Sequence, residues 1–105
     1  MNRNEYKLSF LPLFEEDLNE ITGYIVNHLQ NLSAALQLID DIEAAICTRR
    51  TCPLAFAPYA SSKDRLYPYY RINVRNFSVF YVVIGDTMEV RRILYARRDL
   101  DSLLD

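Results

Sequence analysis

The sequence lacks the residue types from which most metal and disulfide sites are built. Its 105 residues contain no tryptophan, one histidine and two cysteines. A structural zinc site needs about four clustered ligands, and Cys47 and Cys52 have no second cysteine pair or histidine close by in the sequence. We therefore expect no metal, and we interpret the two cysteines as reduced thiols that pack as small apolar side chains.

Long apolar runs and phosphate-binding motifs are also missing. The longest apolar run, Val79–Ile84, has six residues, whereas a membrane-spanning helix needs about 20. No apolar stretch follows the polar N-terminus Met1–Glu5, so we expect no export signal and a cytoplasmic location. The sequence has no GxGxxG, P-loop or HExxH motif, and we expect no cofactor.

Over the whole chain neither basic nor acidic residues are in large excess, but the two kinds are unevenly distributed between the two halves. The net charge of −2 argues against a protein that coats nucleic acid through charge alone. Residues 1–52 carry four basic and eight acidic side chains, whereas residues 53–105 carry eight basic and six acidic ones. Anion-binding chemistry is therefore expected in the second half. The single histidine, His28, lies in the first half, and we interpret it as a surface residue.

The first half of the chain has the pattern of a strand followed by a helical hairpin. Residues 6–10 alternate between apolar and polar, as a short half-buried strand does. Pro12 suits the first turn of a helix, and Ser33 is a candidate cap for a second helix. Apolar residues then recur at helical spacing through residues 12–50: Phe14, Leu18, Ile21, Ile25, Leu29, and Ala35, Leu38, Ile42, Ala45, Ile46.

The second half changes to the period of two that is typical of strands. Strands are predicted over 69–75, 77–84 and 87–96, and Gly85 supplies the positive φ of a two-residue hairpin loop. The nearly continuous apolar strand 77–84 is predicted to be covered on both sides. Residues 100–104 suggest a short helical tail. The sequence thus predicts a single α+β domain over 1–105, with an N-terminal strand, a helical hairpin and an antiparallel three-stranded meander. Helices would pack on one face of the sheet and leave the other free for polar residues.

Arginines mark the face of the sheet that the helices would leave uncovered. Arg71 and Arg75 are predicted to share that face, about 13 Å apart at the usual rise per residue. Arginine suits phosphate because its planar guanidinium donates two parallel hydrogen bonds. Arg97 and Arg98 would extend a basic rim, and the tyrosines at 59, 67, 69 and 70 are interleaved with Lys63 and Arg65 and could stack on bases. The alternative is a solvated face whose arginines pair with Asp64, Glu89 and Asp99.

Arg92 interrupts an apolar row. Strict alternation places it on one strand face with Met88, Val90 and Leu94. A charge at that position must be paired or reached by solvent or a ligand, or its stem must pack while its head extends to an edge.

Three segments resemble the toxins of the RelE/ParE superfamily, and in particular its ParE-like, plasmid-stabilisation members. Those toxins typically read Y-R-x-x-V, then a strand ending in V-F-Y-x-V, then R-V/I-L-x-x-R-R-D. The three motifs occur in the same order in this sequence. Pro12 and Asp17-Leu18 also match in the N-terminal part, so that the resemblance covers nearly the whole chain. The matching segments are Tyr70-Arg71-Ile72-Asn73-Val74, Phe77-Ser78-Val79-Phe80-Tyr81-Val82-Val83 and Val90-Arg91-Arg92-Ile93-Leu94-Tyr95-Ala96-Arg97-Arg98-Asp99.

The resemblance implies the toxin of a type II toxin–antitoxin pair, which arrests growth until a small antitoxin protein binds it. RelE-like members are metal-independent endoribonucleases that cut mRNA on the ribosome. Carried over by motif, Arg75 and Arg98 would hold the scissile phosphate. Tyr95 is the nearest replacement for the acid–base residue, because the tail after Arg98 has no tyrosine or histidine. The residues expected to contact RNA or another target are Lys63, Arg65, Arg71, Arg92 and Arg97.

ParE-like members instead poison DNA gyrase and perform no chemistry, and their pattern matches this sequence more closely. The first hypothesis is therefore a ParE-like toxin that binds DNA gyrase. The second is a ribosome-dependent mRNA endoribonuclease, and the third is a non-toxic homologue that only assembles with a partner. Whether the protein is an enzyme stays open at this point. For either toxin, the antitoxin interface is expected to use the basic second half and an apolar groove between helices and sheet.

Overall fold

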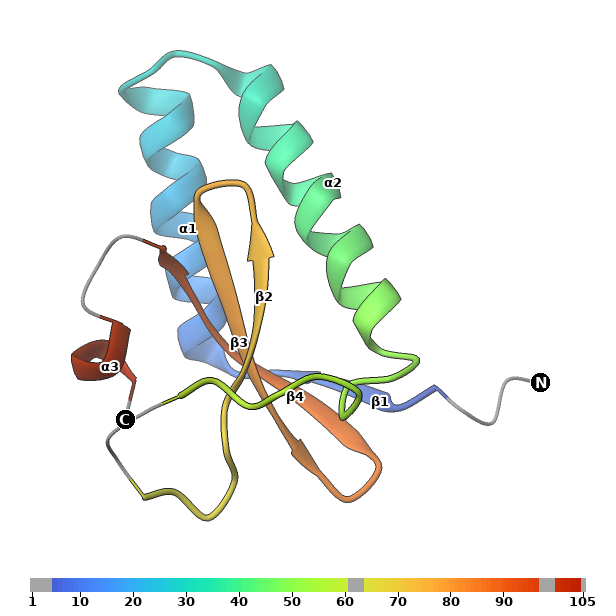
Figure 1. Cartoon of the computed structure of the whole chain (residues 1–105). Coiled ribbons are helices and arrows are strands. Elements are labelled where there is room, and N and C mark those ends of the chain that lie inside the picture. Colours follow the sequence, from blue (N-terminus) through green and yellow to red (C-terminus); the bar gives the residue numbers. More distant parts are fainter. Residues whose placement is uncertain (1–4, 61–63, 97–99, 105) are drawn as a thin grey trace.

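A computed structural model describes residues 5–60, 64–96 and 100–104, with a four-stranded sheet and three helices. The strands lie in the order β1-β4-β3-β2, and β1 is parallel to β4 while the other pairs are antiparallel (Figure 1). The predicted α+β class, with an N-terminal strand, two helices and then three strands, is confirmed. In chain order the elements are β1 (Lys7–Phe10), α1 (Pro12–Asn27), α2 (Leu32–Arg49), β2 (Tyr70–Val74), β3 (Phe77–Ile84), β4 (Thr87–Tyr95) and α3 (Leu100–Leu103).

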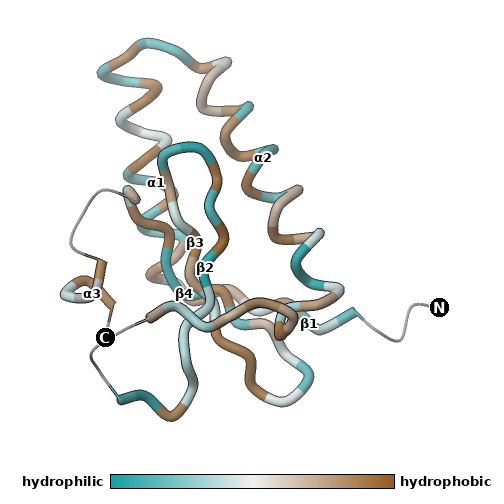
Figure 2. Tube along the Cα trace, in the orientation of Figure 1, coloured by the Kyte–Doolittle hydropathy of each residue, from teal (hydrophilic) through white to brown (hydrophobic). Residues whose placement is uncertain are grey.

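Helices α1 and α2 form the main hydrophobic core with one face of the sheet. Both helices alternate between hydrophobic and hydrophilic residues along their length (Figure 2), as expected for helices with one buried face. Their buried residues Phe14, Leu38, Ile42 and Ile46 match the helical spacing in the sequence. The strands contribute Tyr70, Ile72, Val74, Val79, Tyr81, Met88, Val90 and Ile93.

The other face of the sheet is apolar at its centre, which corrects the prediction that it is free for polar residues. Phe80, Val82 and Leu94 form a second core cluster there with Tyr69 and with the leucines of the C-terminal tail, Leu100 and Leu104. The predicted helical tail exists as α3. Strand β3 is thus buried on both sides, as its continuous apolar run predicts.

The start of α1 and the β3–β4 hairpin are set by the residues predicted for them, whereas the predicted cap of α2 is wrong. Pro12 is the first residue of α1, and Gly85 has a φ of 61° in the hairpin loop between β3 and β4, both as predicted. The cap of α2 is Asn31 instead of Ser33, because the Asn31 side chain accepts a hydrogen bond from the backbone N–H of Ala34 at 3.0 Å.

The two cysteines are also placed differently from the prediction. Cys47 and Cys52 are free thiols and both are exposed, so the interpretation as apolar packing residues is wrong. Cys47 lies in the last turn of α2, and Cys52 lies just after that helix.

A β-bulge in β4 changes which residues face the helices. Phe80 of β3 pairs with Arg92, but the next residue, Tyr81, pairs with Val90, which leaves Arg91 as an extra residue in β4. After the bulge, Ile93 lies in the helix-side core and Leu94 in the second cluster. The prediction that Arg92 and Leu94 share a face with Val90 is therefore wrong, because strict alternation ends at the extra residue.

A buried tyrosine fastens the loop after α2 to the sheet. The Tyr81 hydroxyl donates to the carbonyl of Pro53 at 2.7 Å and accepts from Nη1 of Arg49 at 3.0 Å. The Arg49 guanidinium lies 3.6 Å from the ring centroid of Phe56 and also donates to the carbonyl of Arg71. The end of α2, the loop and β2 thus meet at one arginine.

We expect Tyr81→Phe to lower the free energy of unfolding by about 2 kcal/mol at pH 7, because a lost partner leaves buried polar groups unsatisfied. Burial raises the pKa of Tyr81, and Arg49 opposes only part of that shift. The stabilisation from a raised pKa is complete below the unfolded value of about 10 and is lost as the pH rises through the folded pKa.

The difference between wild type and Tyr81→Phe should therefore shrink above about pH 10, as measured by urea unfolding at several pH values. Tyr70→Phe, which removes a hydroxyl from the ring stacked on Tyr81 at 5.3 Å, is the matched control. A difference that stays constant into the alkaline range would contradict the assignment to Tyr81.

Candidate functional site

Arg71 lies on the face of the sheet away from α1 and α2, as predicted. Alternation along β2 directs Tyr70 and Ile72 into the helix-side core and Arg71 to the opposite side. There its guanidinium carbon lies 5.6 Å from the ring centroid of Tyr59 and 5.9 Å from that of Phe80. Its Nε donates to Ser78 Oγ at 2.8 Å and to Asn73 Oδ1 at 2.9 Å. These contacts fix the orientation of the guanidinium on the surface.

Two further arginines surround Tyr69 on the same face. The guanidinium carbons of Arg65 and Arg91 lie 4.9 Å and 5.8 Å from the Tyr69 ring centroid. Burial opposes the charge on Arg91, but hydrogen bonds with Glu89 and Tyr69 outweigh it and raise the pKa of Arg91. We call this region the basic–aromatic surface, and it comprises Tyr59, Arg65, Arg71 and Arg91 together with the buried rings of Tyr69 and Phe80 beneath them. Of the tyrosines predicted to interleave with cations, Tyr59 and Tyr69 lie on this face, but Tyr69 is buried and Tyr70 points into the helix-side core, which corrects that part of the prediction.

Arg75 does not share the face of Arg71, which corrects the prediction. Strand β2 ends at Val74, and Arg75 follows in the turn with a φ of 55°. Its side chain reaches α2, where Nε and Nη2 both contact Asp41 Oδ2 at 2.6 Å. Hydrogen bonds from Gln37 and Arg75 lower the pKa of Asp41. Because period-two geometry holds only inside a strand, the two arginines lie on opposite sides of the sheet.

Tyr95 is also separated from Arg71. Its ring packs edge-on against Phe77 at 5.9 Å, and its exposed fraction is 39%. The bulge places Tyr95 on the face of Ile93, towards α1, whereas alternation without a bulge had turned it away from Met88 and Val90. The predicted residues Lys63, Arg97 and Arg98 lie outside the described residues.

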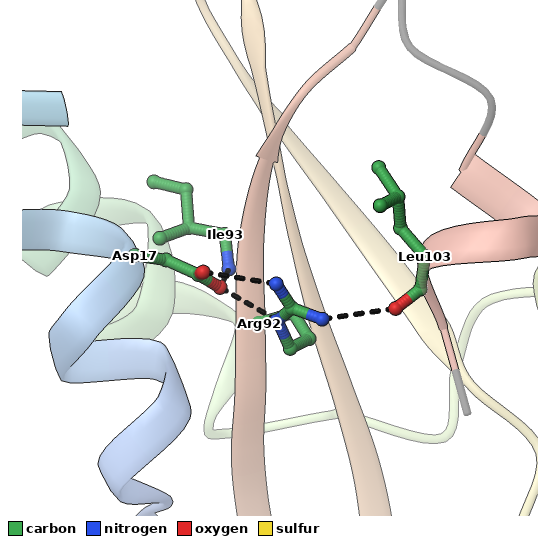
Figure 3. Close-up of polar contacts among 4 residues, drawn as sticks. All are labelled: Asp17, Arg92, Ile93 and Leu103. Carbon is green, nitrogen blue, oxygen red and sulfur yellow. Dashed lines mark hydrogen bonds and ion pairs between the residues drawn. The ribbon is translucent and has the colours of Figure 1, made fainter. Parts of the chain in front are cut away.

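Arg92 is paired inside the protein, which settles the alternatives left open by the sequence. Its Nε and Nη2 donate to the two carboxylate oxygens of Asp17 at 2.7 Å and 2.9 Å, and its Nη1 donates to the carbonyl of Leu103 at 2.9 Å (Figure 3). Asp17 Oδ2 also accepts from the backbone N–H of Ile93 at 3.1 Å. This arginine thus ties together α1, β4 and α3. The sequence offered no signal that Asp17 is its partner.

An apolar groove opens between α1, α2 and β1, where a groove between helices and sheet was predicted. Its volume is about 540 Å³. Every lining residue lies between positions 8 and 47, so the basic second half contributes none of the lining. The residues are Leu8, Phe10, Phe14, Glu15, Leu18, Ile39, Ile42, Glu43, Ile46 and Cys47.

Within residues 5–60, 64–96 and 100–104, no group of three or more histidine, cysteine, aspartate and glutamate side chains could hold a metal ion. No helix in this part of the chain has the length and apolarity needed to cross a membrane. His28 is exposed at the end of α1 and stacks on Tyr24 at 5.0 Å, in agreement with the predicted surface position.

These features define a small α+β domain with a helical hairpin and apolar groove on one side and a basic–aromatic surface on the other. Residues 8–100 match the family described as the ParE toxin of the type II toxin–antitoxin system parDE. The chain belongs to this family, which confirms the resemblance found in the sequence.

A solved structure shows the same fold. A chain of the chromosomal ParDE toxin–antitoxin system from P. aeruginosa aligns with a TM-score of 0.72 and 19% identity, over 90% of this chain and 99% of that one. A chain of the RelB–RelE antitoxin–toxin complex from Methanococcus jannaschii has a TM-score of 0.47 and 23% identity, over 92% of this chain and 99% of that one. Among curated proteins, none matches the sequence.

Proposed function

We propose that this protein is a growth-arresting toxin of the cytoplasm that a cognate antitoxin protein neutralises, and that it acts by binding DNA gyrase without catalysing a reaction. Membership of the ParE toxin family supports the toxin assignment. The choice of a binding mechanism rests on one observation, which is that Arg71 lies on the opposite side of the sheet from Tyr95 and Arg75.

An endoribonuclease needs an acid–base group within hydrogen-bond reach of the reacting oxygen and cations around the scissile phosphate. Arg71 faces away from the helices, whereas Tyr95 packs on Phe77 at the helix side and Arg75 is bound to Asp41 of α2. Among the described residues, these three side chains therefore do not surround a common point. Binding to a protein target requires no such convergence.

The basic–aromatic surface favours one alternative, a ribosome-dependent mRNA endoribonuclease. The half-buried ring of Tyr59 lies beside Arg71, and a ring at a surface can stack a base while cations bind the phosphodiester backbone. Within the described part of the chain, Arg71 donates its side-chain hydrogen bonds through Nε, and its Nη atoms have no hydrogen-bond partner there. Under this alternative, Arg71 and Arg65 contact RNA, Arg75 and Arg98 hold the scissile phosphate, and Tyr95 is the acid–base residue.

The double variant Arg75→Ala/Tyr95→Phe separates the two mechanisms. We expect it to arrest growth as strongly as wild type on induction, because gyrase binding needs neither an acid–base group nor a phosphate-binding arginine at these positions. The measurements are viable counts after induction, supercoiling by purified gyrase with the protein added, and mapping of mRNA 5′ ends.

Wild type should inhibit supercoiling and leave mRNA intact. Loss of arrest in a double variant that remains folded, together with ribosomal A-site cuts by wild type, would replace the gyrase proposal with the endoribonuclease. Unimpaired growth with wild type expressed alone would identify a non-toxic homologue.

A further inference from the structure

We infer that the tip of the α1–α2 hairpin inserts into an uncharged, apolar pocket of the target protein. The hairpin tip comprises residues 24–36, which form the last turn of α1, the connection and the first turns of α2. The inference rests on the proposed function, because it takes DNA gyrase as the target. It names the part of the toxin that makes the contact.

Charged residues are absent from the hairpin tip and from the turns next to it. The stretch Ile21–Ile39 contains no aspartate, glutamate, lysine or arginine, although these residues make up 25% of the whole chain. The centre of a protein–protein interface is depleted of charged residues in the same way. Phosphate backbones and anionic lipid headgroups bind through lysine and arginine, so neither of them fits this surface.

Four large hydrophobic side chains are exposed at the hairpin tip. Each of them keeps between 54% and 60% of its surface accessible to solvent. They are Tyr24 of α1, Leu29 of the connection, and Leu32 and Leu36 of α2. Leu32 and Leu36 are one turn apart and therefore share one side of the helix. Single exposed leucines are common, but this group within a charge-free segment is typical of an interaction site.

The shape of the hairpin tip favours a concave partner. Figure 1 shows the connection between α1 and α2 projecting beyond the ends of the strands. The four side chains expose on the order of 400 Å², whereas a stable interface needs about 800 Å² from each partner. A second copy packed tip to tip would therefore bury too little surface. A pocket encloses a projecting tip on several sides and also covers its uncharged polar residues.

Gly23 is a separate indication of a close contact beside the hairpin tip. It lies inside α1 next to Tyr24, where glycine is less favourable for a helix than alanine. Beyond its immediate neighbours in the helix, an added Cβ would meet only Asn27 Nδ2, at 4.0 Å. Packing among the described residues therefore does not require glycine here. A partner that approaches the helix backbone closely does require it.

A charge of either sign at Leu36 tests the chemistry of the pocket. The affinity of Leu36→Glu and Leu36→Lys for purified DNA gyrase holoenzyme is measured by biolayer interferometry, and supercoiling is assayed in parallel. We expect both variants to lose about thirtyfold in affinity, because a charge buried in an apolar pocket has no partner. Leu36→Met, which nearly conserves the apolar volume, should stay within about threefold of wild type.

Leu66→Glu and Leu66→Lys are the matched controls. Leu66 is an exposed leucine in the loop before β2, and Figure 1 shows that loop at the opposite end of the molecule from the hairpin tip. We expect both controls to bind gyrase within about twofold of wild type, because residues outside the contact contribute little. Leu36 and Leu66 are both on the surface, and thermal unfolding of each variant verifies the fold.

Gly23→Ala separates binding from folding. It should raise the midpoint of thermal unfolding, because alanine favours the helix and has room at this position. It should also lower the affinity for gyrase about fivefold, because the added methyl group prevents close packing of the partner. A purely structural glycine would not produce these opposite effects. Unchanged affinity would contradict a contact that reaches α1 and would overturn the inference as stated.

Failure of this inference and failure of the proposed function give different results. If wild type binds and inhibits gyrase and the Leu36 charge variants do so as well as the Leu66 controls, the inference is overturned and the gyrase proposal stands. Tighter binding by Leu36→Lys than by wild type would indicate an acidic partner surface and would also overturn it. If the Leu36 variants change only the affinity for the antitoxin or the oligomeric state, the tip binds the antitoxin or a second copy, which again overturns it. Absence of gyrase binding by wild type would overturn the proposed function, and the inference with it.

Discussion

Asp17→Asn should lower the free energy of unfolding by about 3 kcal/mol, because it leaves the Arg92 guanidinium without its counter-charge in a site with little solvent. The side chains of Asp17 and Arg92 are only 12% and 18% exposed. The variant also weakens the acceptor for the backbone N–H of Ile93, which lies in the part of β4 beyond its pairing with β1. Urea unfolding at pH 7 measures the effect.

Two further variants show whether the pair or the charge is responsible. Arg92→Lys keeps the positive charge but cannot donate to both Asp17 oxygens and to Leu103 at once. Replacing both partners with apolar residues, as in Asp17→Leu/Arg92→Met, should cost less than Asp17→Asn alone, because no unpaired charge remains. If Asp17→Asn lowers the free energy of unfolding by less than about 1 kcal/mol, the Asp17–Arg92 pair contributes no more than an ordinary surface ion pair.

Phe80→Ala should be the most destabilising of the single substitutions considered, at about 4 kcal/mol, because truncation of a buried phenylalanine leaves a cavity. Its exposed fraction is 0%. Tyr59 and Tyr69 pack edge-on against the ring at centroid distances of 5.2 Å and 6.1 Å, and such pairs add to the burial of area. The ring also lies beneath Arg71.

The segment between Tyr59 and Tyr69 should become less tightly held in the same variant. Tyr59 and Tyr69 are joined by a backbone hydrogen bond of 2.7 Å, and both depend on Phe80 for packing. Proteolysis between residues 59 and 69 should therefore accelerate in Phe80→Ala. Phe80→Leu, which removes less volume than the change to alanine, should cost about 1.5 kcal/mol and loosen the loop less. Equal proteolysis in both variants would contradict the dependence on the ring.

The helix faces, the β3–β4 hairpin and the burial of β3 were predictable, because each follows from the pattern of neighbouring residues in the sequence. The helical spacing of Phe14, Leu38, Ile42 and Ile46 identifies the buried face of each helix, and all four are buried. Gly85 marks the hairpin, and the apolar run of β3 indicates a strand covered on both sides. Each of these depends on residues a few positions apart, so no knowledge of distant contacts is needed.

The candidate site was only partly predictable. The direction of its side chains depends on where the regular alternation between the two faces of a strand ends. Arg71 lies inside β2 and is placed as expected, but Arg75 lies one residue beyond the strand and turns to Asp41 of α2. The extra residue Arg91 in β4 moves Tyr95 to the helix side. The end of β2 leaves no mark in the periodicity of apolar residues, and the break in alternation at Arg91-Arg92 does not by itself show that a bulge follows Val90.

By itself the sequence determined the class of fold, the order of its elements, the buried helix faces and the resemblance to the ParE toxins. Those properties are encoded in local propensity, periodicity and motif. The tertiary structure alone decided that Asp17 neutralises Arg92 across 75 residues of chain, that Arg71 and Arg75 lie on opposite sides of the sheet, and that an acidic-rimmed groove opens between the helices. Each of these depends on the register and packing of segments distant in the chain, which a linear pattern does not contain.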